Sequence, residues 1–234
     1  MFTKVERVAD TDSYVVCSQK EVIALEAEWQ TLLARSECHP VFSSHAWYLA
    51  ALNCFSDLSP RVLVLRKNGE VCGIAPLVWD AAGSQLRFVS DLADYQDFIV
   101  PADSLATANQ LLDAALISSA GIAAHEARTL CLVGLRQNAV LTRLMSDSAK
   151  RDLEPHDCWY ADLSAGYAAF LATRSGNFRY NLRRAQRRAE QASVSVEEVR
   201  SDELDPEQVP ELFLRLHLQR FPDKLFSRPE PQAF

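Results

Sequence analysis

Glycine is scarce in this chain, with only seven among 234 residues. Proteins that hold phosphates on backbone N–H groups often do so at a glycine-rich turn where a strand meets a helix N-terminus. No two glycines here lie within three residues of each other, so the sequence lacks such a turn. The nearest substitute is the segment 134–138, a strand end followed by a short helix with one arginine. The glycines are Gly69, Gly73, Gly83, Gly121, Gly134, Gly166 and Gly176.

Long apolar runs and closely spaced cysteines are also absent. No run approaches the roughly 20 apolar residues of a membrane-spanning helix, and Lys4, Glu6 and Arg7 interrupt the N-terminus, unlike a secretory signal. The six cysteines are scattered without a C-x-x-C pair, which argues against a disulfide framework or a zinc site. His39 and His45 have no third metal ligand nearby. We therefore expect a cytoplasmic protein with reduced cysteines, no metal and no membrane span.

The overall charge limits the kinds of partner. Hydrophobic residues make up 48% of the chain and charged residues 24%, which is typical of a globular protein. The formal net charge is −7. General binding to nucleic acids or anionic membranes requires a broad positive field, so the composition disfavours both. Any site for an anionic ligand must therefore be local.

The hydrophobic pattern predicts an α/β fold with a mixed sheet flanked by helices. Two β-rich runs, 60–66 and 70–79, are separated by Lys67-Asn68-Gly69, whose Asn-Gly pair can adopt the positive φ angles that a tight hairpin requires. Further strands are expected at 13–17, 85–90, 97–100, 129–135 and 158–163. Helices are expected at 20–36, 43–55, 105–122 and 140–149.

The pattern changes after Leu163. The next elements expected are a helix at 167–173, an arginine-rich helix, a strand at 194–199 and a helix at 207–221. One strand and a few helices cannot bury a core of their own. We therefore expect a domain over 1–163, followed over 164–234 by an arginine-rich linker and the opening of an incomplete second domain.

Residues 177–188 contain five arginines and no acid. Phe178, Leu182, Ala185 and Ala189 recur at helical spacing, which predicts an amphipathic helix with a narrow apolar stripe and a cationic back. Because arginine pairs well with phosphate, this helix is a candidate site for an anionic ligand; a solvated helix face is the alternative. The arginines are Arg179, Arg183, Arg184, Arg187 and Arg188.

Six segments spread over most of the chain carry a resemblance to a known family. They are the helix around Trp29, Pro40–Trp47, Gly73–Leu77, Asp94–Phe98, the arginine helix and Leu216–Phe221. In this order they resemble the acetyltransferases of the GNAT superfamily that accompany bacterial cellulose and exopolysaccharide synthesis, the CelD/BcsL type. The resemblance implies two GNAT-like units in tandem, with acetyl-CoA as co-substrate and a small-molecule or saccharide acceptor.

The resemblance also implies roles for particular residues. The acidic loop at 91–97 follows a strand end, where Asp94 or Asp97 would accept a proton from the acceptor or only orient it, and Tyr95 would donate a proton to the leaving thiolate. The five arginines would meet the phosphates of coenzyme A or of a nucleotide-linked sugar. His217 would contact the substrate, with a packed or capping histidine as the alternative. For the acidic loop, a solvated turn is the alternative.

The missing glycine-rich turn leaves open whether the chain is an enzyme. The leading hypothesis is an N- or O-acetyltransferase that transfers directly from acetyl-CoA. A second is a non-catalytic GNAT-like scaffold whose arginine helix meets an acidic protein partner. A third is a tRNA-dependent aminoacyl transferase of the peptidoglycan-bridge type, whose binding would fall steeply with salt.

Overall fold

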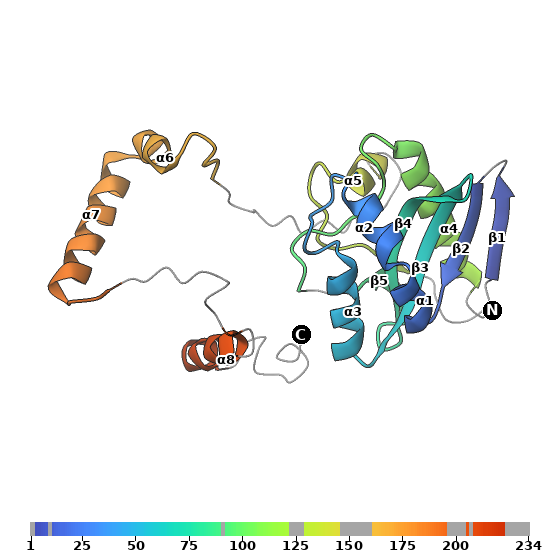
Figure 1. The fold of residues 1–234 in the computed structure, drawn as a ribbon, viewed down its shortest axis with the longest axis horizontal. Helices are drawn as coiled ribbons and strands as arrows, with labels where there is room; N and C mark the ends of the chain where they lie inside the picture. Colours follow the sequence, from blue (N-terminus) through green and yellow to red (C-terminus); the bar gives the residue numbers. More distant parts are fainter. Residues whose placement is uncertain are drawn as a thin grey trace. The chain divides into compact units, whose positions relative to one another are not determined.

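The computed structural model describes residues 3–8, 11–89, 92–121, 129–145, 161–195, 205 and 208–222. The chain divides into two compact units (Figure 1). The first comprises Met1–Ala149 with Phe221–Phe234, and the second comprises Lys150–Arg220.

The first unit is built on a six-stranded sheet in which spatial order follows chain order. All neighbouring strands are antiparallel except the last pair, β5 and β6, which is parallel. This mixed sheet with its helices confirms the predicted α/β fold. The strands are β1 (Thr3–Val8), β2 (Thr11–Val16), β3 (Leu58–Lys67), β4 (Glu70–Asp80), β5 (Gln85–Phe88) and β6 (Leu130–Cys131).

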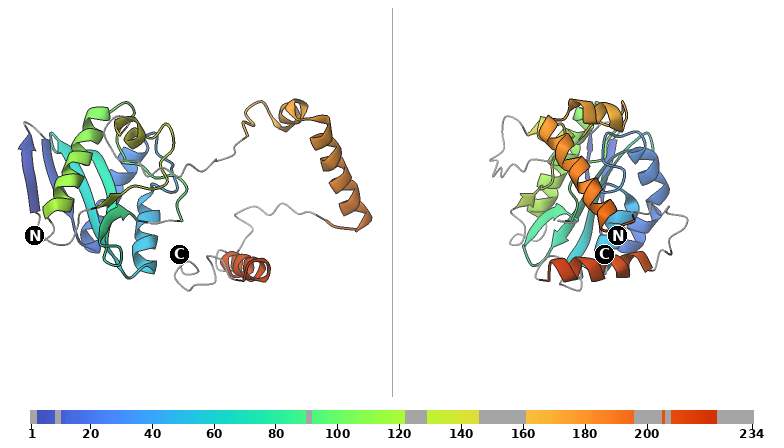
Figure 2. Two further views of the ribbon diagram at one scale, coloured as in Figure 1. Left: turned by 180° about the vertical axis from the view of Figure 1, so that it is seen from behind. Right: turned by 90° about the vertical axis from the view of Figure 1, so that its left-hand side faces the viewer.

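Helices cover both faces of the sheet, as Figures 1 and 2 show together. Strand β3 explains the two layers, because its side chains alternate between the faces. Val62 and Val64 belong to the core beneath α1–α3, whereas Leu63 and Leu65 belong to the core beneath α4 and α5. The helices are α1 (Gln19–Ala24), α2 (Glu26–Leu33), α3 (His45–Cys54), α4 (Leu105–Gly121) and α5 (Val140–Leu144).

Local signals placed the central hairpin correctly. Asn68 and Gly69 both have positive φ angles, +53° and +84°, and they join β3 to β4. The helix expected over 20–36 is instead two helices, because the chain turns at Leu25, which ends α1 and precedes α2. Strand β1 was not predicted from the sequence; it lies at the edge of the sheet, where it pairs only with β2.

Three expected strands differ from the structure. The segment 97–100 forms only an isolated bridge between Ile99 and Ile74. The strand expected at 129–135 is reduced to the two residues of β6, because the chain reaches a positive φ of +72° at Gly134. Residues 161–163 are not in a strand, and the rest of the strand expected at 158–163 lies outside the described residues.

The second unit contains α6 (Tyr167–Thr173), α7 (Gly176–Gln191) and α8 (Gln208–Arg220). Helix α7 is the predicted arginine helix, and Ser175 caps it by accepting from the N–H of Phe178. Aromatic contacts from Phe170 to Phe178 join α6 to α7. None of the described residues of α6, α7 or α8 is buried. Most of the strand expected at 194–199 lies outside the described residues, and the opening of a second domain stays a prediction.

Candidate functional site

Three loops of the first unit meet at the carboxyl ends of β5 and β6. Because these strands are parallel, the loops that follow them leave the same edge of the sheet, where ligands of open α/β sheets commonly bind. The N–H of Gln96, in the loop after β5, donates to the carbonyl of Gly134, in the loop after β6, at 2.9 Å. The loop before α3 joins them, because Arg136 Nη2 donates to the carbonyl of Glu37 at 2.7 Å. We call residues 37–44, 92–98 and 132–139 the three-loop cluster.

Tyr95 is the point at which all three loops touch. Its ring lies 5.5 Å from that of His39 and 6.1 Å from that of Phe42, measured between centroids. The guanidinium of Arg136 lies 5.7 Å from the centroid of the Tyr95 ring, within the range of a cation–π contact. His39 and Phe42 stack on each other at 4.7 Å. The half-buried phenol is thereby held by packing from three sides.

Asp97 is buried and accepts three backbone hydrogen bonds. Its Oδ2 accepts from the N–H of Val140 at 2.6 Å, and its Oδ1 accepts from the N–H groups of Leu141 and Phe98 at 3.2 and 2.9 Å. Since Ala139 has no side-chain acceptor, Asp97 serves as the missing cap of α5. Burial raises the pKa of the Asp97 carboxyl above its ordinary value, while the three N–H bonds oppose that shift. The geometry thus gives Asp97 a positioning role; whether it also takes part in catalysis stays a prediction.

Asp94 is exposed, unlike Asp97 three residues further on. It precedes the half-buried Tyr95 in the same loop, so a carboxylate and a phenol stand next to each other in the chain at the cluster. Of the predicted catalytic residues, Asp94 and Tyr95 are therefore the two that a substrate can reach most easily.

The segment 134–138 does not form a phosphate cradle at α5. The N–H groups of Val140 and Leu141, which would face a phosphate, already donate to the carboxylate of Asp97. Gly134 is required for a different reason: its φ is positive, and an added Cβ would lie 3.2 Å from the carbonyl oxygen of Ala93. The turn therefore serves close packing of two loops.

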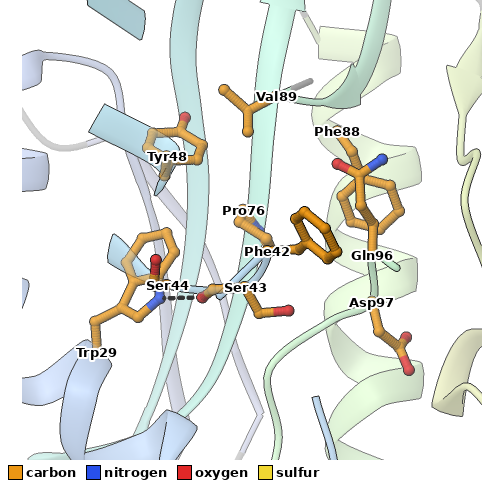
Figure 3. Close-up of a pocket in the computed structure, with 10 residues that line it drawn as sticks. All are labelled: Trp29, Phe42, Ser43, Ser44, Tyr48, Pro76, Phe88, Val89, Gln96 and Asp97. Carbon is orange, nitrogen blue, oxygen red and sulfur yellow. Dashed lines mark hydrogen bonds between the residues drawn. The ribbon is translucent and has the colours of Figure 1, made fainter. Parts of the chain in front are cut away.

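A small hollow lies beside the cluster, between α2, α3 and the strands (Figure 3). A water-sized sphere has about 10 Å³ to move in there, which is room for about one water molecule. Trp29 forms one wall, fixed by a bond from its Nε1 to the carbonyl of Ser43 at 2.9 Å. The hollow is therefore too small to enclose a ligand. Its lining residues are Trp29, Phe42, Ser43, Ser44, Tyr48, Pro76, Phe88, Val89, Gln96 and Asp97.

Cys38 lies in the same region, in a second small hollow that Asp97 also lines. Burial, together with the nearby negative charge of Asp97, raises the pKa of the Cys38 thiol to about 12. Its Sγ donates to the carbonyl of Phe98 at 3.3 Å. A thiol with this pKa is protonated at neutral pH, so Cys38 does not supply a nucleophile.

The remaining predicted site residues belong to the second unit. Arg179 is partly buried, and its Nη1 donates to the carbonyl of Ala172 at the end of α6, at 3.2 Å. The other four arginines are exposed on α7, and the ring of His217 on α8 lies 5.5 Å from that of Phe213. Asp94, Tyr95 and Asp97 thus share one loop of the first unit, and the five arginines share α7 of the second. A role of the arginines or of His217 in binding coenzyme A or substrate stays a prediction.

His39, Phe42 and Arg136 were missed as site residues from the sequence. Phe42 and His39 stand in or next to the segment 40–47, which carried part of the family resemblance, so that segment was the available signal. Arg136 had been considered only as a possible phosphate ligand, whereas it contacts the ring of Tyr95 and the carbonyl of Glu37.

Within the described residues, no group of three or more His, Cys, Asp or Glu side chains is placed to hold a metal ion. Among the described helices, none has the length and apolar character needed to cross a membrane. No family model, no curated protein and no solved structure matches this chain.

Proposed function

We propose that this chain acts in acyl transfer from acetyl-CoA to a hydroxyl or amine, with the three-loop cluster as the acceptor side of the site. One observation carries the proposal. The segments 40–47 and 94–98, both part of the resemblance to GNAT acetyltransferases, lie about fifty residues apart, yet Phe42 and Tyr95 bring them into contact. Their meeting at the carboxyl ends of a parallel strand pair supports a shared site.

The proposed chemistry uses the two accessible residues of the cluster. The acceptor oxygen or nitrogen attacks the thioester carbon and loses its proton to the carboxylate of Asp94. As the C–S bond breaks, the thiolate takes a proton from the hydroxyl of Tyr95. Arg136 and His39 hold the phenol in place, and Asp97 holds the loop by binding the N-terminal amides of α5. Exopolysaccharide or its precursors are the acceptor class that the resemblance implies.

A non-catalytic scaffold is the second candidate, and the Asp97 contacts favour it. The α5 amides at the end of the parallel pair are already satisfied by Asp97, so they cannot hold a pyrophosphate. A unit of this kind would bind an acceptor or a partner protein through the three-loop cluster, without acetyl-CoA.

Calorimetric titration with acetyl-CoA and a thiol-release assay with saccharide acceptors test the two candidates. Under the acyltransferase proposal, Asp94→Asn lowers kcat by about 10²–10⁴-fold while acetyl-CoA affinity is kept, because the change removes the general base alone. Tyr95→Phe lowers kcat as well, since the proton donor is lost. Glu70→Gln, an exposed carboxylate in the β3–β4 hairpin, is the matched control and leaves kcat unchanged. Absence of both acetyl-CoA binding and transfer would favour the scaffold.

A further inference from the structure

The α6–α7 hairpin presents a charged surface that the proposed acyl transfer does not use. Arg179 is occupied in binding a carbonyl at the end of α6, and Phe178 packs on Phe170. The four arginines further along α7 are exposed, and Tyr180 stands beside them with 52% of its surface exposed. We call Tyr180, Arg183, Arg184, Arg187 and Arg188 the arginine–tyrosine face.

Helical geometry places this face opposite the apolar stripe of α7. At roughly 100° per residue, the four arginines centre about 180° away from Leu182 and Ala189, and Tyr180 falls between their two rows. Leu182 and Ala189 are only half-buried, so the hairpin covers part of the stripe. The outer side of α7 is therefore a convex, positively charged surface with an exposed aromatic ring between its two rows of arginines.

The arginines have no acidic partner within the part of the chain that the structure describes. No ion pair there joins a carboxylate to any of them, and Arg187 Nε contacts only the carbonyl of Arg183, at 3.4 Å. Like charges at i, i+4 destabilise a helix, and Arg183–Arg187 and Arg184–Arg188 are two such pairs. A bound polyanion would relieve this repulsion.

We propose that the arginine–tyrosine face of α7 binds single-stranded nucleic acid. Guanidinium groups bind phosphates with charge-assisted hydrogen bonds, and an exposed aromatic ring stacks on an unpaired base. The face lies on the convex outer side of a helix, so it suits a strand of successive phosphates that gains from several weak contacts. The four arginines span roughly 7.5 Å of helix, enough for two to three successive phosphates of a strand whose bases stay stacked about 3.4 Å apart.

Two other polyanions fit the geometry less well. A membrane-surface helix inserts an apolar face, but on α7 Leu182 and Ala189 are already half-buried and Phe178 packs on Phe170 of α6. An acidic protein would satisfy the charges but leaves Tyr180 without a role. The proposal does not depend on acyl transfer, because it rests on contacts within α6 and α7 alone.

Fluorescence anisotropy of the full chain with a labelled 12-nucleotide single-stranded RNA tests the proposal. We expect a dissociation constant of about 1–100 µM at physiological salt. A plot of the logarithm of the association constant against the logarithm of the salt concentration should have a slope of about −1.4 to −2.1, from two to three phosphates at about 0.7 each. Replacing the four arginines with glutamine, a good helix former, should abolish binding and keep the helical circular dichroism. Tyr180→Ala should weaken binding about 5- to 100-fold.

Control variants and control ligands test whether binding is specific to the arginine–tyrosine face and to single-stranded nucleic acid. Tyr167→Ala, an exposed tyrosine on α6, and Arg215→Gln, an exposed arginine on α8, should leave RNA affinity unchanged. Equal affinity for a duplex of the same length, or no effect of Tyr180→Ala, would overturn the proposal. So would arginine-dependent binding to phosphatidylglycerol vesicles or polyglutamate without RNA binding. Displacement of RNA by equimolar acetyl-CoA would also overturn the proposal and would assign the face to the cofactor. If acyl transfer fails while RNA binding is intact, only the enzymatic proposal is refuted.

Discussion

Replacing Asp97 with alanine should destabilise the first unit strongly, because two amides at the start of α5 lose their acceptor. Val140 and Leu141 are 5% and 0% exposed, so water cannot replace the carboxylate easily. A buried donor left without a partner costs about 1–3 kcal/mol, and loss of an N-cap costs about 0.5–2 kcal/mol. These overlapping effects predict that Asp97→Ala lowers the free energy of unfolding by about 2–4 kcal/mol.

Urea unfolding at pH 7, followed by tryptophan fluorescence with Trp29 of the core as a probe, measures this change. Asp94→Ala is the matched control, because Asp94 is exposed in the same loop, and its effect should stay within about 0.5 kcal/mol. Asp97→Asn keeps an amide oxygen as acceptor and should cost less than Asp97→Ala. A loss below about 1 kcal/mol for Asp97→Ala would refute the capping role.

The same carboxyl gives a pH dependence of defined sign. Because the pKa of Asp97 is raised in the folded protein, the folded state binds a proton more tightly than the unfolded state. The wild-type free energy of unfolding should therefore contain a component that falls as the pH rises from the ordinary value of 3.8 through the raised pKa. Asp97→Asn should lack this component. If the two proteins show the same pH profile of stability in that range, the direction of the shift is wrong.

Three further predictions concern contacts elsewhere in the first unit. Glu28→Gln removes the bidentate ion pair with Arg66 that joins α2 to β3, so it should lower the free energy of unfolding by about 0.5–1 kcal/mol at pH 7. Because the pairing lowers the pKa of Glu28, this difference between wild type and variant should vanish as the pH falls below 4.5. Urea titrations at several pH values measure it. Gly134→Ala should cost about 1 kcal/mol or more in thermal unfolding, because of its positive φ and a carbonyl in the opposing loop, whereas an unchanged Tm would contradict that strain. At pH 8, iodoacetamide should label the exposed Cys17 but not Cys38, whose thiol pKa is raised to about 12, and mass spectrometry of the peptides would reveal equal labelling if this is wrong.

Much of the secondary structure followed from short-range signals. The hairpin between β3 and β4 could be predicted because Asn68 and Gly69 adopt positive φ without help from the rest of the fold. Helices α4 and α7 could be predicted because apolar residues recur every three or four positions, a pattern that depends only on residues about one helical turn apart. The cap of α7 by Ser175 is equally local.

The candidate site could be predicted only in part. The acidic loop was recognised as a site because Asp94, Tyr95 and Asp97 are adjacent in the chain and follow a strand. The partners that define their roles are distant: Asp97 binds the N–H of Val140 43 residues away, and Tyr95 contacts Phe42 from a loop more than fifty residues earlier.

Local sequence patterns were enough to predict most of the helices, the central hairpin and the place where positive charge is concentrated, because each depends on neighbours within about one turn of chain. The strand Thr3–Val8 is apparent only in the folded protein, since its hydrogen bonds come from β2. The role of Asp97 is likewise apparent only in the folded protein. Whether a carboxylate is a free base or a buried helix cap depends on the backbone amides and the solvent around it, and the packing of distant loops sets both.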